Sequence, residues 1–324
     1  MFLLKSKRQM MQNKLRKELN FNYESFIDSR NYLFKHCRKL EQVRFSCLFE
    51  NLNQDSLVEQ ITKYQNKDGG FGHGLEPALR TRYSSSLCTT VALQILNDMT
   101  TIKKYKIIKK AIVYLENTFD QKTQSWRIIP EKAQFDPHAP WWNQIINKKK
   151  YTTYNLNPTS EIVSYFIYYN NQGYSEFIEK NIKNVMKIIS NIKAISMHDY
   201  LCLMRLYKNY NHHDDFKTRL KEYLIKELYN VVELNPDMWD QYCLQPLQIA
   251  ESPKSEFYPI LKKYIPLNLK HVIDSHNHDG SWTPAWSWGN YHEESWEGAQ
   301  EEWKGVLIYE HLKILKNYDL IENA

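Results

Sequence analysis

The chain of 324 residues is poor in the residues that make turns, with only nine glycines and eleven prolines. All-β sandwiches and barrels need many turns, so this scarcity favours long helices. No stretch approaches the roughly 18 uncharged apolar residues that a membrane-spanning helix takes. The first four residues, MFLL, are too short for the core of a signal peptide, so we expect a cytoplasmic protein.

Cysteine is also scarce, and its five copies are odd in number and scattered. An odd number of scattered cysteines does not indicate a disulfide framework, so we expect reduced thiols, most of them in the core. No metal site is expected, because the histidine pairs at 212–213 and 276/278 lack the i, i+4 spacing of helical ligands. The chain has no phosphate loop, dinucleotide fingerprint or nucleophile elbow, and we expect no cofactor.

Excess positive charge is confined to one end of the chain. The formal net charge is +6, and residues 1–20 hold six basic residues against one glutamate. The remainder is close to neutral, so no nucleic-acid partner is expected. We interpret residues 1–20 as a basic N-terminal extension. It is either a solvated terminus or a weak contact with an acidic membrane surface.

Aromatic residues, by contrast, are abundant: they make up 14% of the chain, with 23 tyrosines and nine tryptophans. This is more than core packing usually takes, and it favours an aromatic-lined cavity. The alternative is a composition generally rich in Tyr, Asn and Lys. The hydrophobic share of 42% is that of a globular protein with ample material for a core.

Apolar residues recur at helical spacing along most of the chain, and no segment shows convincing strand alternation. Serines at 84–86 can cap the helix after them, and Asn157-Pro158 and Asn235-Pro236 each look like an N-cap followed by proline. Long irregular stretches at about 120–156 and 276–296 are expected to be functional loops. We expect helices near 23–38, 40–52, 56–66, 84–98, 104–118, 158–170, 175–191, 197–210, 214–229, 236–249, 256–274 and 298–317.

A weak internal repeat joins a tight turn to an aromatic residue. Gln65–Gly72 reads QNKDGGFG, His276–Trp282 reads HNHDGSW, and a degenerate copy at 119–126 reads FDQKTQSW. Self-similar helix–turn units indicate a repeat architecture. Six helical hairpins closed into a ring would use about twelve helices, which agrees with the expected number.

These strings resemble the QW-type repeats of squalene–hopene cyclases and the glycine-rich repeats of protein prenyltransferase β subunits. The longer strings QNKDGGFGHGLEPALR, DGSWTPAWSWGNY and EEWKGVLIYEHLKIL resemble bacterial proteins grouped as prenyltransferase-like or squalene-cyclase-like repeats without assigned chemistry. The resemblance covers residues 40–318. It implies an all-α fold of the α/α-toroid type, with residues 21–324 as one domain, but no single reaction, because one toroid hosts many functions.

The catalytic signatures of these families are missing. Class II cyclases protonate an alkene with the middle Asp of a DxDD motif, whereas the nearest string here is His212-His213-Asp214-Asp215. We interpret Asp214 as a helix cap. Prenyltransferases bind zinc through Asp-x-Cys, which does not occur in this chain. Whether the protein is an enzyme is therefore left open.

The string HGLEP places His73 and Glu76 directly after the first turn, with Arg80 nearby. A glutamate held among aromatic rings would have a raised pKa and could donate a proton, with His73 as its acid/base partner and Arg80 holding a ligand. The alternative is a capping glutamate paired with Arg80.

Two tryptophan-rich loops supply the other candidate residues. The string FDPHAPWWN contains Asp136 as a third acid/base candidate, and its rings could close over a ligand or pin the loop to the core. We expect both loops and the HGLEP segment to meet at one mouth of the ring. Asp240 follows the start of the predicted helix 236–249 and would face the ring interior if Leu244 and Leu247 face the neighbouring helix. The candidate ligand-binding residues of these segments, besides Arg80, are His138, Trp141, Trp142, Asp240, Trp286 and Trp288.

The leading hypothesis is a cyclase-like or prenyltransferase-like toroid that binds an apolar small molecule, such as an isoprenoid, in a central aromatic cavity. One alternative is a carbohydrate-active enzyme of the (α/α)6 type, which would need paired carboxylates beside an aromatic groove. The other is a binding or scaffold protein without catalysis.

Overall fold

The computed structural model describes residues 19–99, 106–148, 154–169 and 174–322. This part of the chain is mainly α-helical, as predicted, and none of its helices combines the length and apolarity needed to cross a bilayer. The basic extension predicted at residues 1–20 lies outside the described residues except for its last two. The helices are α2 (Tyr23–His36), α3 (Lys39–Phe49), α4 (Asp55–Thr62), α5 (Ser86–Asn97), α6 (Lys106–Asn117), α7 (Leu156–Tyr168), α8 (Ser175–Ile189), α9 (Met197–Asn209), α10 (Asp215–Val231), α11 (Pro246–Ile249), α12 (Tyr258–Leu261), α13 (Ile265–Asp274) and α14 (Glu293–Asn317).

The described residues fall into two compact units. Unit 1 is drawn from Met1–Leu57, Val232–Ser287 and Glu297–Ala324, and unit 2 from Val58–Val231 and Trp288–Trp296. Unit 1 therefore combines both ends of the chain, whereas unit 2 comes mainly from the middle. The single domain predicted over residues 21–324 stays a prediction.

The helix starts follow the capping signals of the sequence. The Ser85 hydroxyl accepts a hydrogen bond from the backbone N–H of Cys88 and caps α5, as predicted. Asp214 accepts one from the N–H of Lys217 at 3.0 Å, which confirms its interpretation as a cap. Each cap satisfies an N–H that the first turn of a helix leaves without an intrahelical acceptor.

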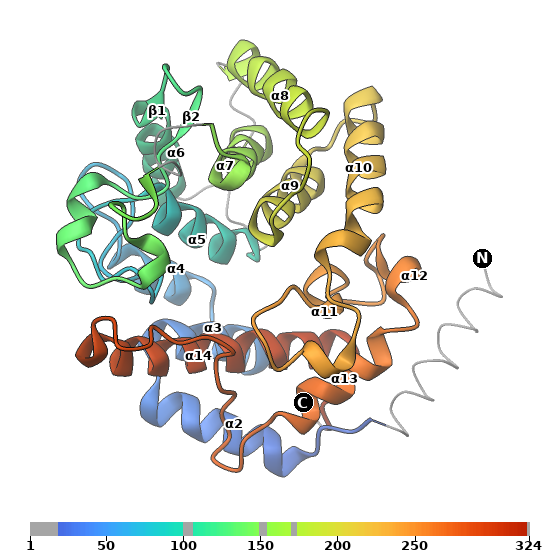
Figure 1. Cartoon of the computed structure of the whole chain (residues 1–324). Coiled ribbons are helices and arrows are strands. Elements are labelled where there is room, and N and C mark those ends of the chain that lie inside the picture. Colours follow the sequence, from blue (N-terminus) through green and yellow to red (C-terminus); the bar gives the residue numbers. More distant parts are fainter. Residues whose placement is uncertain (1–18, 100–105, 149–153, 170–173, 323–324) are drawn as a thin grey trace. The chain divides into compact units, whose positions relative to one another are not determined.

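The core of unit 2 is organised around α7, which packs against α5, α6, α8 and α9 (Figure 1). Its apolar residues Ile162, Val163 and Phe166 are fully buried. A helix that contacts neighbours on several sides is apolar over most of its circumference, which explains why α7 carries a long run of buried residues.

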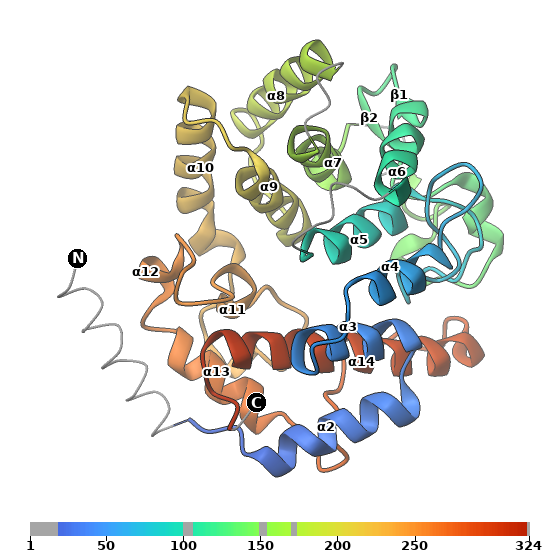
Figure 2. The same ribbon diagram turned by 180° about the vertical axis from the view of Figure 1, so that it is seen from behind.

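In unit 1, α14 runs alongside α2 and α3 (Figure 2). Arg44 of α3 forms a 2.7 Å ion pair with Glu310 of α14. Gly305 of α14 allows the close approach, because a Cβ there would lie 2.8 Å from the Cβ of Cys37. The N-terminal hairpin of the chain is therefore packed on its C-terminal helix within one unit.

The two Asp-Gly turns of the repeat have the same geometry. Asn66 N–H donates to Gly70 O at 2.8 Å, and in the second turn Asn277 N–H donates to Ser281 O at 2.9 Å. Gly69 and Gly280 both have φ +93°, a conformation that favours glycine. The aspartate of each turn accepts a hydrogen bond from the amide two residues later.

The degenerate third copy differs, because it forms a short β-hairpin that was not predicted. Strands β1 (Phe119–Asp120) and β2 (Ser125–Trp126) pair antiparallel. Gln124 takes the positive φ of 56° in place of a glycine. The indole N–H of Trp126 donates to Leu115 O, as Trp282 donates to Val272 O in the second copy. The aromatic anchor of the repeat is thus retained without its Asp-Gly turn.

The predicted helix at 236–249 is wrong. Asn235 caps only the 3-10 turn η6 (Pro236–Met238), and the chain is irregular until α11 begins at Pro246. Proline disfavours a helical conformation at the residue before it, so Pro246 begins a new helix instead of continuing one. Proline likewise stands at the start of both α12 and α13, into which the predicted helix 256–274 is divided.

His311 makes the stability of unit 1 depend on pH. Its ring lies edge-on to Trp282 at 5.0 Å, and burial, aided by repulsion from His271 and His276, lowers its pKa to about 3. In the unfolded chain a histidine has a pKa of about 6.5, so unfolding takes up a proton between these values. Stability is therefore present above pH 6.5 and is lost as the pH falls toward 3.

We expect the free energy of unfolding to be lower at pH 5 than at pH 7, with His311 responsible for on the order of 1–2 kcal/mol of the difference. Urea titrations at the two pH values measure it. His311→Phe should reduce the difference, leaving the smaller parts due to His138 and His276, whose pKa values are also lowered by burial. An unchanged pH dependence in this variant would contradict the assignment.

Candidate functional site

Two of the stretches singled out in the sequence pair directly in unit 2. Segment 76–82, which follows HGL, runs antiparallel to segment 136–139, with Leu79 opposite His138. Backbone hydrogen bonds of 2.9 and 3.0 Å lie beside this pair. The hydroxyl of Thr81 also donates to the carboxylate of Asp136. The prediction that HGLEP and the loop 120–156 meet is therefore confirmed for these residues.

The His138 ring is buried and held by hydrogen bonds at both nitrogens. Nδ1 lies 2.6 Å from the backbone oxygen of Asp136, and Nε2 lies 3.2 Å from the hydroxyl of Tyr291. A carbonyl oxygen only accepts, so Nδ1 carries the hydrogen and Nε2 of the neutral ring accepts from the phenol. The same phenol oxygen accepts from the amide of Asn143 at 3.0 Å. One chain of donors and acceptors thus runs from Asn143 through Tyr291 to His138.

Electrostatics keep His138 neutral near pH 7. Burial lowers the pKa of its imidazole, and the nearby His292 lowers it further, while the carbonyl of Asp136 partly opposes them. The ring centroids of His138 and His292 are 5.5 Å apart. A neutral imidazole with its lone pair on Nε2 is a potential proton acceptor, and its partner Tyr291 is partly exposed.

The predicted acid/base residues differ in how far they are buried. Glu76 is buried, whereas His73 is exposed, with a positive φ of 57° and its Nε2 at 2.8 Å from Asn66 Oδ1. Asp136 and Arg80 are partly exposed. Asp136 contacts His138 through its carbonyl oxygen.

The predicted ligand-binding aromatic residues fall in both units. In unit 2, Trp142 and Trp288 are buried, and Trp141 is 38% exposed. Trp286 belongs to unit 1, where it packs edge-on against Tyr242 and Trp303. The predicted meeting of the three loops is thus observed for Tyr291 and its neighbours, while Trp286 lies in the other unit.

Asp240 lies in unit 1 and is exposed. Its expected orientation toward a ring interior assumed that Leu244 and Leu247 lie with it on one helix, 236–249, which does not form. The indole of Trp239 instead donates to Glu233 O at 2.9 Å, and Trp239 O accepts from the Gln245 amide at 2.9 Å. These bonds hold the segment as a loop.

Sequence reasoning missed the polar partners of His138. Tyr291 stood in the tryptophan-rich string WTPAWSWGNY as one more aromatic residue, and Asn143 ended FDPHAPWWN without comment. The only available signal was that both strings end on a residue able to hydrogen-bond. Asn143 and Tyr291 are 148 positions apart, so no local pattern indicates their contact.

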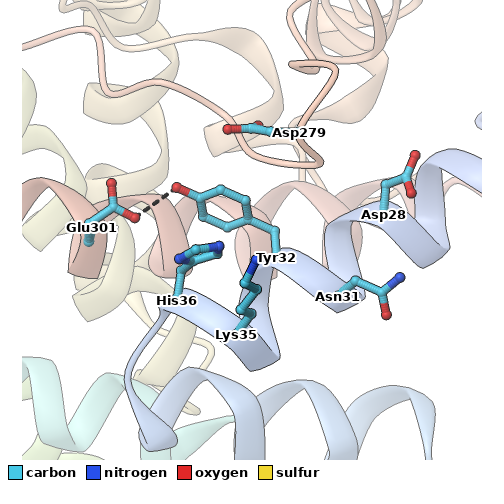
Figure 3. Close-up of a pocket in the computed structure, with 7 residues that line it drawn as sticks. All are labelled: Asp28, Asn31, Tyr32, Lys35, His36, Asp279 and Glu301. Carbon is cyan, nitrogen blue, oxygen red and sulfur yellow. Dashed lines mark hydrogen bonds between the residues drawn. The ribbon is translucent and has the colours of Figure 1, made fainter.

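A second site that the sequence did not indicate lies in unit 1. A pocket of about 550 Å³ opens beside α2, where the turn after α13 and the side of α14 face it (Figure 3). The Tyr32 hydroxyl donates to Glu301 at 2.7 Å, and Lys304 contacts both groups. The pocket is lined by Asp28, Asn31, Tyr32, Lys35, His36, Asp279 and Glu301.

A third polar cluster in unit 2 is centred on a buried carboxylate. The carboxylate of Glu161, 2% exposed, accepts hydrogen bonds from Gln94, Tyr165 and Arg205, and the thiol of Cys202 lies 3.5 Å away. Both oxygens have partners, so this carboxylate holds α5, α7 and α9 together and is not a catalytic candidate.

Within the described residues, no group of three or more His, Cys, Asp or Glu side chains is placed to bind a metal ion. No protein-family model, no curated protein and no solved structure matches the chain. The geometry of these sites therefore carries the functional argument alone.

Proposed function

We propose that this chain is an α/α toroid of the terpenoid-cyclase and prenyltransferase type. The two Asp-Gly turns support a closed ring. A Cβ on Gly69 would lie 2.3 Å from Lys110 O of α6, two helices after its turn. A Cβ on Gly280 would lie 2.3 Å from Asp28 O of α2. Among the described residues α14 is the helix after the second turn, and α2 holds the position that α6 holds in the first repeat. Packing of the last repeat on the first helix is the arrangement that a closed ring would have.

We further propose that the protein binds an apolar small molecule and transfers a proton at Tyr291 and His138. The observation that carries this proposal is the hydrogen bond from Tyr291 to His138, which brings the C-terminal tryptophan-rich segment onto the paired segments 76–82 and 136–139. Trp141 on the same loop as His138 supplies a partly exposed ring that can contact an apolar or cationic ligand.

The hydrogen-bond directions define the proton path. A proton leaving the ligand would be accepted by the Tyr291 oxygen as the phenol proton moves to Nε2 of His138. The resulting imidazolium keeps its Nδ1–H on the carbonyl of Asp136, and Asn143 continues to donate to the Tyr291 oxygen. The imidazolium can then return its Nε2 proton through the Tyr291 oxygen to another carbon of the ligand, so the reaction class is acid/base isomerisation, in line with a cyclase-like enzyme.

Binding and proton transfer are tested separately on the full chain. We expect farnesol to change the intrinsic tryptophan fluorescence saturably and maltose to leave it unchanged. We expect farnesyl diphosphate incubated with the protein in heavy water to give a product carrying deuterium, detected by mass spectrometry. Tyr291→Phe should keep farnesol binding and slow the reaction by about 100-fold or more, the usual size of an acid/base contribution.

Tyr229→Phe is the matched control, because Tyr229 is 57% exposed on α10. It should behave as wild type in both assays. Binding of maltose without farnesol would replace this proposal with the carbohydrate-active alternative. Absence of binding by both would favour a scaffold protein.

A further inference from the structure

The pocket of unit 1 is lined by one polar face of α2. Asp28, Asn31, Tyr32, Lys35 and His36 follow the i, i+3, i+4, i+7, i+8 spacing and therefore lie on one face of α2. The opposite side of the helix buries Phe26 and Leu33. Figure 3 shows this face opposite Asp279 and Glu301.

The three carboxylates of the pocket differ in their partners. Glu301 forms an ion pair with Lys304 at 2.7 Å and accepts the Tyr32 hydroxyl. Asp279 accepts hydrogen bonds from the amide and the hydroxyl of Ser281 and interacts electrostatically with Lys304 and His276. Among the described residues, the Asp28 carboxylate has no hydrogen bond or ion pair, and it interacts electrostatically with His276. Two carboxylates from different segments thus line the pocket without a direct ion pair.

We propose that this pocket binds a small organic cation of the amine class, with its ammonium group at Asp28 and Asp279 and its carbon chain along the Tyr32 ring. Ammonium groups are attracted both by carboxylates and by aromatic faces, and the pocket supplies the two together. Its volume of about 550 Å³ is in the range of small-molecule sites. A metal ion is a poorer occupant, because no cluster of three suitable ligands exists in the described part of the chain.

This pocket belongs to unit 1, whereas Tyr291 and His138 belong to unit 2. The proposed amine site therefore does not depend on the proton transfer proposed for Tyr291 and His138. Lys35 lines the same pocket and has no ion pair among the described residues. Its charge opposes a bound ammonium group. The pocket therefore offers two substitutions whose expected effects on binding have opposite signs.

Calorimetric titration of the full chain with spermidine at low salt tests the proposal. We expect saturable binding that Asp28→Asn weakens about tenfold and Lys35→Ala strengthens about twofold or more. Glu24→Gln is the matched control, since Glu24 is exposed on the same helix outside the pocket and loses the same charge. It should change the affinity much less than Asp28→Asn.

Equal weakening by Asp28→Asn and Glu24→Gln would mean that spermidine responds to the overall charge of α2, and it would overturn the proposal. Failure of spermidine to bind at all would do the same. The thermal midpoint of each variant, measured without ligand, separates loss of binding from loss of folding, because neither Asp28 nor Lys35 has a side-chain hydrogen bond or ion pair to lose within the described residues.

Discussion

Replacing Gly280 with alanine is expected to lower the free energy of unfolding by about 2–5 kcal/mol. The residue has φ +93°, where a side chain is strained, and the added Cβ would lie 2.3 Å from the backbone oxygen of Asp28. A backbone atom in the middle of α2 cannot move aside as the end of a flexible side chain would. Gly69→Ala should have a similar effect, because its Cβ would lie 2.3 Å from Lys110 O. Urea unfolding followed by circular dichroism measures both variants.

Substitutions at two other glycines distinguish the cost of a positive φ from the cost of a steric clash. Gly289 has φ +56° and no heavy atom within 4 Å of a built Cβ, so Gly289→Ala should cost only about 1 kcal/mol. Gly298 lies within α14 with similar open space, and Gly298→Ala should stabilise the protein by up to about 1 kcal/mol. If Gly280→Ala proves no more costly than Gly289→Ala, the close packing of the turn on α2 is wrong.

Glu161→Ala should destabilise unit 2 by about 3 kcal/mol. The substitution removes a buried acceptor shared by Gln94 and Tyr165 at 2.7 Å and by Arg205 at 3.1 Å. It leaves these donors without their acceptor and opens a cavity among α5, α7 and α9. Arg205 is 32% exposed, so its guanidinium can form hydrogen bonds with water in the variant. The expected loss is therefore at the low end of the range for a buried ion pair. Chemical denaturation gives the value directly.

Glu161→Gln distinguishes the carboxylate charge from its shape. The amide oxygen can still accept from Gln94 and Tyr165, but its N–H₂ would then face Arg205, so we expect a loss of about 1–2 kcal/mol. Lys270→Ala serves as a control for an exposed ion pair, since Lys270 and Asp274 are 60% and 57% exposed. It should cost less than about 1 kcal/mol. Equal losses for Glu161→Ala and Lys270→Ala would show that the cluster adds no stability.

Local signals in the sequence were sufficient for most helices and for the repeat. Ser85 and Asp214 were identified as caps because capping requires only a side-chain oxygen and an amide two or three residues away. The Asp-Gly turns were predictable for the same reason, since Asp68 and Asp279 bond amides within two residues. In each case the residues that interact are also neighbours in the sequence.

Distant contacts were not predictable in this way. The three segments around His138 were each singled out by composition, but the partner that fixes the ring, Tyr291, lies 153 positions away. Glu161 looked like any helical glutamate, because its burial depends on Arg205, 44 positions later. For helix 236–249, the local N-cap signal at Asn235 was correct, but it starts only a short 3-10 turn. The prediction failed because the hydrogen bonds of Trp239 and the proline at 246 prevent the helix from continuing.

Unit 1 has a consequence for how the chain is made. Its first segment ends at Leu57, and its next begins at Val232, after the main segment of unit 2. At a synthesis rate of about 5–20 residues per second, α2 and α3 are made on the order of ten seconds or more before the later segments of unit 1 on which they pack. During that time the buried faces that include Phe26 and Phe45 are uncovered. We therefore expect unit 2 to fold first on the ribosome, and the N-terminal hairpin to be the segment that a nascent-chain chaperone protects.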